Sequence, residues 1–268
     1  MKIFKIYIIF ILSLTLIFAF TIFLIPKPEG FPILEYHTIT NTPDEDSVKY
    51  NVFPSDFSAQ LDYLKENGYN TITTLDYAYA KLGWKRLPEK PIILTFDDGY
   101  EDNYLYMLPI LEAHGMKAVV YVITNEIGKP GYLTVEELAD MQNRGVEIGS
   151  HTANHRPLID MRPKDIIHEV RDSKRFLEWT LHSNVFSFSY PNGFYSDELI
   201  KTLKKENYLT AVTGDAGLNS LDTNSYLLQR VNIPQPTFGL LEFKLRLFKA
   251  ELAAKMGIFQ HKEQGVKN

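Results

Sequence analysis

The chain has 268 residues, of which 45% are hydrophobic, so it can bury the core of one α/β barrel domain. Its formal net charge of -5 argues against nucleic acid as a partner, because proteins that bind the phosphate backbone usually carry a basic balance. The chain contains no cysteine, which excludes disulfides, thiolate metal sites and cysteine nucleophiles and leaves His, Asp and Glu as metal ligands.

An uncharged apolar run opens the chain. Residues 6–25 would form a helix roughly 30 Å long, about the thickness of a bilayer core. Lys2 and Lys5 precede it, so the positive-inside rule keeps the N-terminus in the cytoplasm and puts the rest outside. A cleaved signal peptide is the alternative, although its apolar stretch is usually only about 7–15 residues and no A-x-A site follows here. We expect an uncleaved transmembrane anchor at 1–25, a stiff linker at 26–32, and a single-pass protein of the cell membrane with its catalytic domain extracellular.

Strand-like and helix-like stretches alternate from residue 33 to residue 236. Strand patterns lie at 33–39, 70–75, 91–98, 117–124, 146–152, 185–190, 209–214 and 227–233. Helical patterns lie between them, chiefly at 55–68, 103–115, 134–145, 163–181 and 196–208. This order predicts one α/β domain at 33–236, a parallel sheet with crossover helices that closes or nearly closes into a barrel. Active groups should then lie at the C-terminal ends of the strands.

The remaining residues, 237–268, begin with an apolar helical pattern into which four basic side chains are mixed, Lys244, Arg246, Lys249 and Lys255. We expect an amphipathic helix packed on the barrel, followed by a polar tail. Contact with a membrane surface is the alternative for its apolar side.

Two adjacent carboxylates follow a predicted strand. Asp97 and Asp98, in "TFDDG", would raise each other's pKa unless a cation relieved their repulsion. His151 and His155, in "SHTANH", follow another strand, and their H-x3-H spacing would place two imidazoles on the same side of a helical turn. Either motif alone has an ordinary explanation, a helix N-cap or two unrelated histidines. Together they favour a metal site with open coordination positions, which is typical of catalysis.

"TFDDG" and "SHTANH", with "LTVEELADMQNRGVEIG" leading into the second, resemble the first two motifs of the polysaccharide deacetylases, the NodB-homology domain of carbohydrate esterase family 4. The resemblance covers about residues 31–234. It implies a distorted (β/α)7 barrel that removes N-acetyl groups from a polymer of N-acetylglucosamine with a divalent metal, usually zinc. Carried over by position, Asp98, His151 and His155 bind the metal and Asp97 is the general base.

The third motif of that family, R-x-P-[YF]-G, is only partly present as "SYPNG". Ser189 stands in place of the arginine and Asn192 in place of the aromatic residue. In the family the arginine orients the base, and a backbone N–H of this segment helps to hold the oxyanion. The stretch from Tyr190 to Asn192 can still offer that N–H. Arg230, on the last predicted strand, could point into the barrel mouth and pair with Asp97, although a plain surface arginine is equally compatible with the sequence.

The late L-x-H motif that supplies the general acid in the family is missing. "ILEYH" resembles the P-[IV]-L-x-Y-H motif of the biofilm poly-N-acetylglucosamine deacetylases, and its His37 lies at the end of the first predicted strand. The first and last strands of a closed barrel are neighbours, so either can reach the same place. We expect His37 to protonate the leaving amine, with a core histidine as the alternative.

The leading hypothesis is a membrane-anchored, metal-dependent N-deacetylase of an extracellular or cell-wall N-acetylglucosamine polymer. One alternative is a hydrolase of the same fold that acts on a non-sugar amide, because fold and metal site do not fix the substrate. A second is a catalytically weak carbohydrate-binding protein, which the altered third motif would favour. Poly-N-acetylglucosamine, peptidoglycan and chitin-like polymers are all compatible with the sequence.

Overall fold

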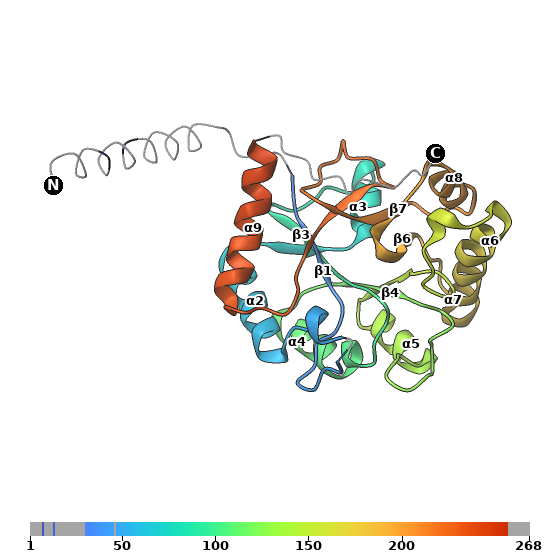
Figure 1. Cartoon of the computed structure of the whole chain (residues 1–268), viewed down its shortest axis with the longest axis horizontal. Coiled ribbons are helices and arrows are strands. Elements are labelled where there is room, and N and C mark those ends of the chain that lie inside the picture. The colour runs from blue at the N-terminus through green and yellow to red at the C-terminus, as the bar shows by residue number, and fades with distance from the viewer. Residues whose placement is uncertain (1–6, 8–12, 14–29, 46, 257–268) are drawn as a thin grey trace.

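A computed structural model describes residues 7, 13, 30–45 and 47–256 (Figure 1). Apart from residues 7 and 13, the predicted anchor at 1–25 lies outside the described residues, as does most of the predicted linker at 26–32. Among those that are described, no helix is both long and apolar enough to cross a membrane. The barrel domain expected between residues 33 and 236 lies wholly within the described part, apart from residue 46.

Seven parallel strands form a closed ring. The strands are β1 (Ile33–Tyr36), β3 (Pro91–Phe96), β4 (Val119–Val122), β5 (Glu147–Ser150), β6 (Ser187–Ser189), β7 (Thr210–Ala216) and β8 (Leu228–Asn232). They are hydrogen-bonded in the order β1-β8-β7-β6-β5-β4-β3, and a pairing of β1 with β3 closes the ring. A short eighth strand, β2 (Asn70–Ile72), pairs with the first half of β3, whereas β4 pairs with its second half. The distorted (β/α)7 barrel that the resemblance implied is therefore confirmed.

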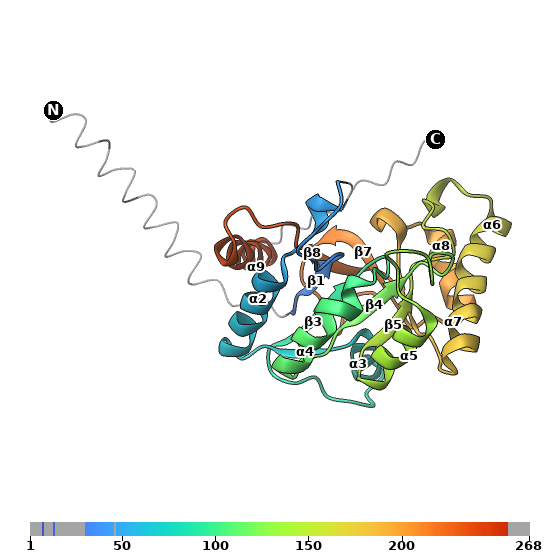
Figure 2. The ribbon, with the colours of Figure 1, turned by 90° about the horizontal axis from the view of Figure 1, so that it is seen from below.

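Helices cover the outside of the ring (Figures 1 and 2). They are α2 (Pro54–Glu66), α3 (Thr74–Lys81), α4 (Leu108–His114), α5 (Val135–Asn143), α6 (Pro163–Ile167), α7 (Ser173–Leu181), α8 (Asp197–Lys205) and α9 (Leu240–Lys255). The helix expected at 163–181 is interrupted, because a π-helical turn at His168–Asp172 separates α6 from α7. The helix expected after residue 236 is α9, which packs beside α2 and β8.

Side chains alternate between the two faces of the ring, as the two-residue period of a strand requires. Leu34, Leu94 and Val120 belong to the large core between strands and helices. Their sequence neighbours Ile33, Ile93 and Val119 belong to a second, smaller cluster on the inner face.

The barrel interior is filled in the middle by Tyr121. A Cβ atom on Gly149 of β5 would lie 2.5 Å from the ring of Tyr121, so only glycine fits there. Above this level, toward the C-terminal strand ends, the interior becomes polar and contains buried side chains such as Thr95, Asp97 and Arg230. A barrel that is apolar below and polar above can hold a charged site only at its upper mouth.

Candidate active site

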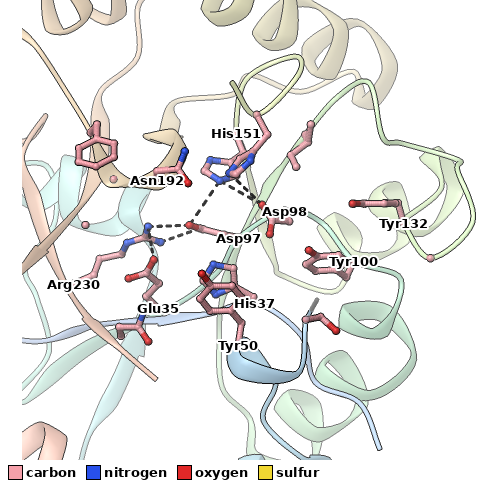
Figure 3. A pocket seen from close by; sticks show the side chains of 18 of the residues that line it. Glu35, His37, Tyr50, Asp97, Asp98, Tyr100, Tyr132, His151, Asn192 and Arg230 are labelled. Carbon is pink, nitrogen blue, oxygen red and sulfur yellow. Dashed lines mark hydrogen bonds and ion pairs between the residues drawn. The ribbon is translucent and has the colours of Figure 1, made fainter. Parts of the chain in front are cut away.

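The polar mouth of the barrel opens into a cleft of about 800 Å³ (Figure 3). Its lining comes from the loops that follow β1, β3, β4, β5 and β6, and from the strands β1, β7 and β8 themselves. The sequence-predicted residues among the lining are His37, Asp97, Asp98, His151, His155 and Arg230. Segments that are far apart in the chain thus meet at the C-terminal ends of the strands, where parallel barrels place their functional groups.

Asp98, His151 and His155 form one cluster in this cleft. His151 Nε2 lies 3.5 Å from Asp98 Oδ1, and His155 Nε2 lies 3.6 Å from the same oxygen. The ligand atoms of the three side chains all lie within 4.8 Å of one another. Asp98 Oδ1 is buried and has no hydrogen-bond partner among the described residues. A buried carboxylate oxygen without a donor is costly unless a cation satisfies it, so one carboxylate and two imidazoles fit a divalent ion such as zinc.

Left-handed backbone conformations build this cluster. Asp98 has φ 76° in the turn that follows β3. The two histidines do not share a helical turn, so the reason given for their convergence from the sequence is wrong. Thr152 has φ 70° and His155 has φ 53°, which produces a tight non-helical turn directly after β5. The Glu169 carboxylate holds that turn by accepting hydrogen bonds from the backbone N–H groups of residues 153 and 154, at 3.0 and 2.9 Å.

The ring orientation of His151 is set by a backbone carbonyl. Its Nδ1 lies 2.8 Å from the carbonyl oxygen of Ser189, which can only accept, so Nδ1 carries the hydrogen. Nε2 then presents its lone pair toward Asp98. Burial also lowers the pKa of His151, although the carboxylates of Asp97 and Asp98 oppose the shift. A neutral imidazole with its lone pair toward the carboxylate is the form that binds a metal.

Asp97 is balanced by a different partner. Arg230 donates two parallel hydrogen bonds to it, Nη1 to Oδ1 at 2.9 Å and Nη2 to Oδ2 at 2.8 Å. Ser189 Oγ donates a third to Oδ2 at 3.1 Å. Burial is the largest single influence and would raise the pKa of Asp97, but the charge and hydrogen bonds of Arg230, together with His151 and His37, outweigh it and hold the pKa well below its usual range. Asp97 is therefore an ionised carboxylate that the protein itself neutralises, 3.9 Å from His151 Nε2.

His37 lies on the other side of Asp97, just beyond the end of β1. A nitrogen of His37 and carboxylate oxygens of Glu35 and Asp97 all lie within 4.8 Å of one another. Glu35 Oε1 also receives Arg230 Nη2 at 3.1 Å, so one guanidinium serves two carboxylates. The ring of Tyr50 stacks on the His37 imidazole, with centroids 4.8 Å apart and planes 24° apart. Figure 3 shows these side chains on the opposite side of Asp97 from His151.

The loop that carries His37 is fastened to the segment after the Asp pair. Asn103 Nδ2 donates to the carbonyl oxygen of His37 at 3.0 Å, and Asp102 Oδ1 accepts from the backbone N–H of Ile39 at 3.0 Å. Burial raises the pKa of Asp102 to about 6. The positions of His37 and of the Asp pair are therefore coupled through one short segment.

The hydrogen bonds of the third-motif segment, residues 190–192, show which of its residues can offer a backbone N–H to a substrate. Tyr190 does not contribute: its N–H donates to the carbonyl of Val212 at 3.2 Å, and its buried hydroxyl donates to the carbonyl of Tyr226. Pro191 has no N–H. Asn192 lines the cleft in a left-handed conformation, with φ 56°. Within the predicted stretch from 190 to 192, Asn192 is therefore the residue whose backbone can face a substrate.

Comparison with known proteins assigns the architecture and the cluster to a family. The family model for polysaccharide deacetylases matches residues 85–211, which include the Asp pair and both histidines. YxkH of Bacillus subtilis, whose name assigns it to the polysaccharide deacetylases, is 35% identical over 207 residues, covering 77% of this chain and 72% of the relative. This chain belongs to the polysaccharide deacetylase family. As a family member it is a hydrolase, a de-N-acetylase.

Two further relatives place the deacetylase among characterised proteins. It is 24% identical over 203 residues to the poly-beta-1,6-N-acetyl-D-glucosamine N-deacetylase of Staphylococcus aureus, covering 70% of each chain. The solved structure of the Streptococcus pyogenes deacetylase PplD, in complex with acetate, superposes with a TM-score of 0.75 and 29% identity. That superposition covers 84% of this chain and 99% of PplD.

Sequence reasoning missed several cleft residues of the deacetylase. Glu35 could have been found, because it lies two positions before His37 and strand alternation puts both on one face. Tyr100 and Tyr132, whose rings stack with centroids 5.2 Å apart at the cleft wall, come from loops whose pairing no local pattern indicates.

Proposed function

We propose that this deacetylase removes N-acetyl groups from an N-acetylglucosamine polymer outside the cell, with zinc held by Asp98, His151 and His155. The observation that carries the proposal is the contrast between the adjacent aspartates. Asp97 is saturated by Arg230 and Ser189, whereas Asp98 presents an unpartnered buried oxygen to two imidazoles. One carboxylate is arranged to accept a proton and the other to bind a cation.

The proposed mechanism assigns one task to each residue. A divalent ion bound at the triad would supply Lewis acidity, which polarises the acetamide carbonyl and lowers the pKa of water, to about 7 on zinc. Asp97, ionised and oriented by Arg230, accepts a proton from the attacking water. The backbone N–H of Asn192 donates a hydrogen bond to the developing oxyanion. His37 protonates the amine nitrogen as the C–N bond breaks, and acetate and a free glucosamine amine are the products.

Two relatives support the choice of substrate. The S. aureus relative is named for poly-beta-1,6-N-acetyl-D-glucosamine, and PplD was solved with acetate, the product expected of this reaction. The open cleft, lined by Tyr50, Tyr100 and Tyr132, offers aromatic faces of the kind that pack on sugar rings. A tether to the cell membrane through the apolar run at 6–25 would place the barrel outside the cell, next to such polymers.

The test is acetate release by the full-length chain from three substrates: poly-β-1,6-N-acetylglucosamine, peptidoglycan and chitin oligomers. We expect release from at least one of them, loss of release in chelator, and recovery on addition of zinc. Hydrolysis of a simple non-sugar amide, with all three polymers inert, would favour the alternative of a same-fold amidase. Binding of a polymer without any acetate release would favour the carbohydrate-binding alternative.

A further inference from the structure

The helix α9 uses only part of its apolar surface to pack on the barrel. Phe243 and Leu247 are buried against the domain. Leu241, Leu245 and Phe248, in contrast, are 59%, 56% and 58% exposed. Exposing three large apolar side chains on one helix is unusual for a surface that meets only water.

These exposed residues form a continuous stripe. Spacings of three and four residues place Leu241, Leu245, Phe248 and the partly exposed Leu252 along one side of the helix; we call these four residues, together with Phe238, the α9 stripe. Phe238, just before the helix, is 74% exposed. The stripe therefore extends along most of the length of α9 and continues past its first residue.

Lysines border the stripe on both sides. Lys244 and Lys255 lie along one edge by helical spacing and Lys249 along the other. The two acidic residues of α9 are engaged elsewhere: Glu242 pairs with Arg246 at 2.7 Å, and Glu251 accepts a hydrogen bond from the Tyr69 hydroxyl at 3.3 Å. An apolar stripe with lysine along both edges is typical of a helix that lies in the interface of an anionic membrane.

The position of α9 agrees with that pattern. The described domain begins at Gly30, and Phe31 forms a two-way backbone pairing with Asn219. Gly217, two residues earlier, lines a cavity of about 170 Å³ together with Ala253 from the C-terminal half of α9. A chain leaving the domain at Gly30 toward a membrane would therefore start beside α9. In Figures 1 and 2 the helix lies on one side of the barrel and α7 on the other.

We propose that the α9 stripe docks on the surface of an anionic lipid bilayer, with the bordering lysines at the level of the lipid phosphates. The apolar side chains enter the boundary between headgroups and acyl chains, and the lysines are attracted to the negative surface. This contact is independent of the catalytic proposal, because none of the stripe residues lines the cleft.

The absence of cysteine makes a direct test possible. The full-length chain carrying Phe248→Cys or Leu245→Cys is labelled with an environment-sensitive fluorophore and bound to vesicles of phosphatidylglycerol and phosphatidylcholine that contain spin-labelled quencher lipids. We expect a blue shift and strong quenching at both positions. The matched control is Trp179→Cys on α7, which replaces a side chain that is 76% exposed on the far side of the barrel and should not be quenched.

The electrostatic part of the proposal has its own readout. In the Phe248→Cys background, Lys249→Gln removes one lysine. It should weaken the vesicle binding that the quenching reports by about fivefold in low salt, and by less in high salt. Equal quenching at Trp179, or none at Phe248, would overturn the proposal. So would a blue shift at Phe248 without lipid: one that grows with protein concentration would indicate a second copy of the chain on the stripe, and one that does not would indicate another segment of the same chain.

Discussion

The two sides of the cleft balance negative charge in different ways, although Asp97 and Asp98 are adjacent in the chain. On one side, Asp97 is neutralised by a guanidinium and a hydroxyl that belong to the protein. On the other, Asp98 meets two imidazoles, one of which is held with its lone pair toward the carboxylate. A carboxylate whose charge and hydrogen bonds are satisfied by the protein can stay ionised and exchange protons without a ligand. A carboxylate with a buried oxygen that has no donor is satisfied only when a cation binds. The surroundings thus give identical side chains different chemistry.

Removing the Asp98 carboxylate, which faces the two imidazoles, should have the largest effect on activity. Asp98→Ala should lose bound metal and reduce acetate release by more than the roughly 10⁴-fold that a missing general base can cost, because no carboxylate then remains in the triad. Metal content by elemental analysis and acetate release measure the two effects. A variant that keeps a full equivalent of metal and normal turnover would remove the distinction between the two sides.

Replacing Asp97, the carboxylate that Arg230 and Ser189 neutralise, should affect turnover but not metal content. Asp97→Asn should retain the metal, since Asp97 is not in the triad, but lose about 10²–10⁴-fold in turnover, the usual contribution of a general base. The same two measurements apply, with the Asp98 variant as reference. If both variants lost metal equally, the two carboxylates would have the same role.

His37 tests whether the acid also lies on the Asp97 side of the cleft. His37→Ala should slow release from an N-acetyl sugar by about 10²–10⁴-fold, because the amine leaving group needs a proton. It should slow hydrolysis of 4-nitrophenyl acetate far less, because nitrophenolate leaves without one. Equal losses on amide and ester would point to a role in folding or in binding instead.

Arg230 is the cation that pairs with both Asp97 and Glu35. Arg230→Met should cost about 3–5 kcal/mol of unfolding free energy, because the buried carboxylate of Asp97 and the partly buried one of Glu35 lose their shared cation. Without the guanidinium, burial dominates and the pKa of Asp97 rises, so the acidic limb of the activity profile should move to higher pH. Urea unfolding and pH profiles measure these effects. Combining Arg230→Met with Asp97→Asn should cost less stability than the sum of the two, since the unpaired charge at residue 97 is then absent.

The smallest effect concerns a third carboxylate of the same segment, Asp102, which accepts hydrogen bonds from amide donors and has no cationic partner within the described part of the chain. Burial raises its pKa from 3.8 to about 6. Its ionisation therefore costs stability increasingly as the pH rises from about 4 to 6, and this cost stays constant at higher pH. Asp102→Asn should therefore stabilise the protein by up to about 3 kcal/mol at pH 8, at about 1.4 kcal/mol per pKa unit, and have little effect near pH 4. A stability change that is the same at both pH values would show that ionisation is not its cause.

Much of the barrel could be predicted from the sequence, because its elements follow local rules. Thr134 and Glu137, three residues apart, form a capping box at the start of α5, and α2 ends just before the glycine at residue 68. Periodicity does not say which strand edges meet, however. The division of one edge of β3 between β2 and β4, and the π-helical turn between α6 and α7, depend on tertiary packing.

The site could be predicted where its residues follow strands directly. Asp97, Asp98 and His151 were found in this way. For Arg230 the sequence was equally compatible with a partner of Asp97 and with a surface arginine. The route to His155 was wrong, because a turn through left-handed residues has no simple sequence signature outside Gly and Asn. Tyr190 was included because a backbone donor cannot be assigned to one residue until its neighbours' hydrogen bonds are known.

The position of β1 between β8 and β3 has a consequence for protein engineering. In a closed ring the first and last strands are covalently unconnected neighbours, so a barrel cut elsewhere and rejoined there would keep every side chain of the cleft in place. A circular permutant in which β1 follows β8 would move His37 from the beginning of the chain to its end while leaving it next to Asp97. Motif order along a chain is thus a matter of where the ring is opened, and proteins with the same site can present it in different orders.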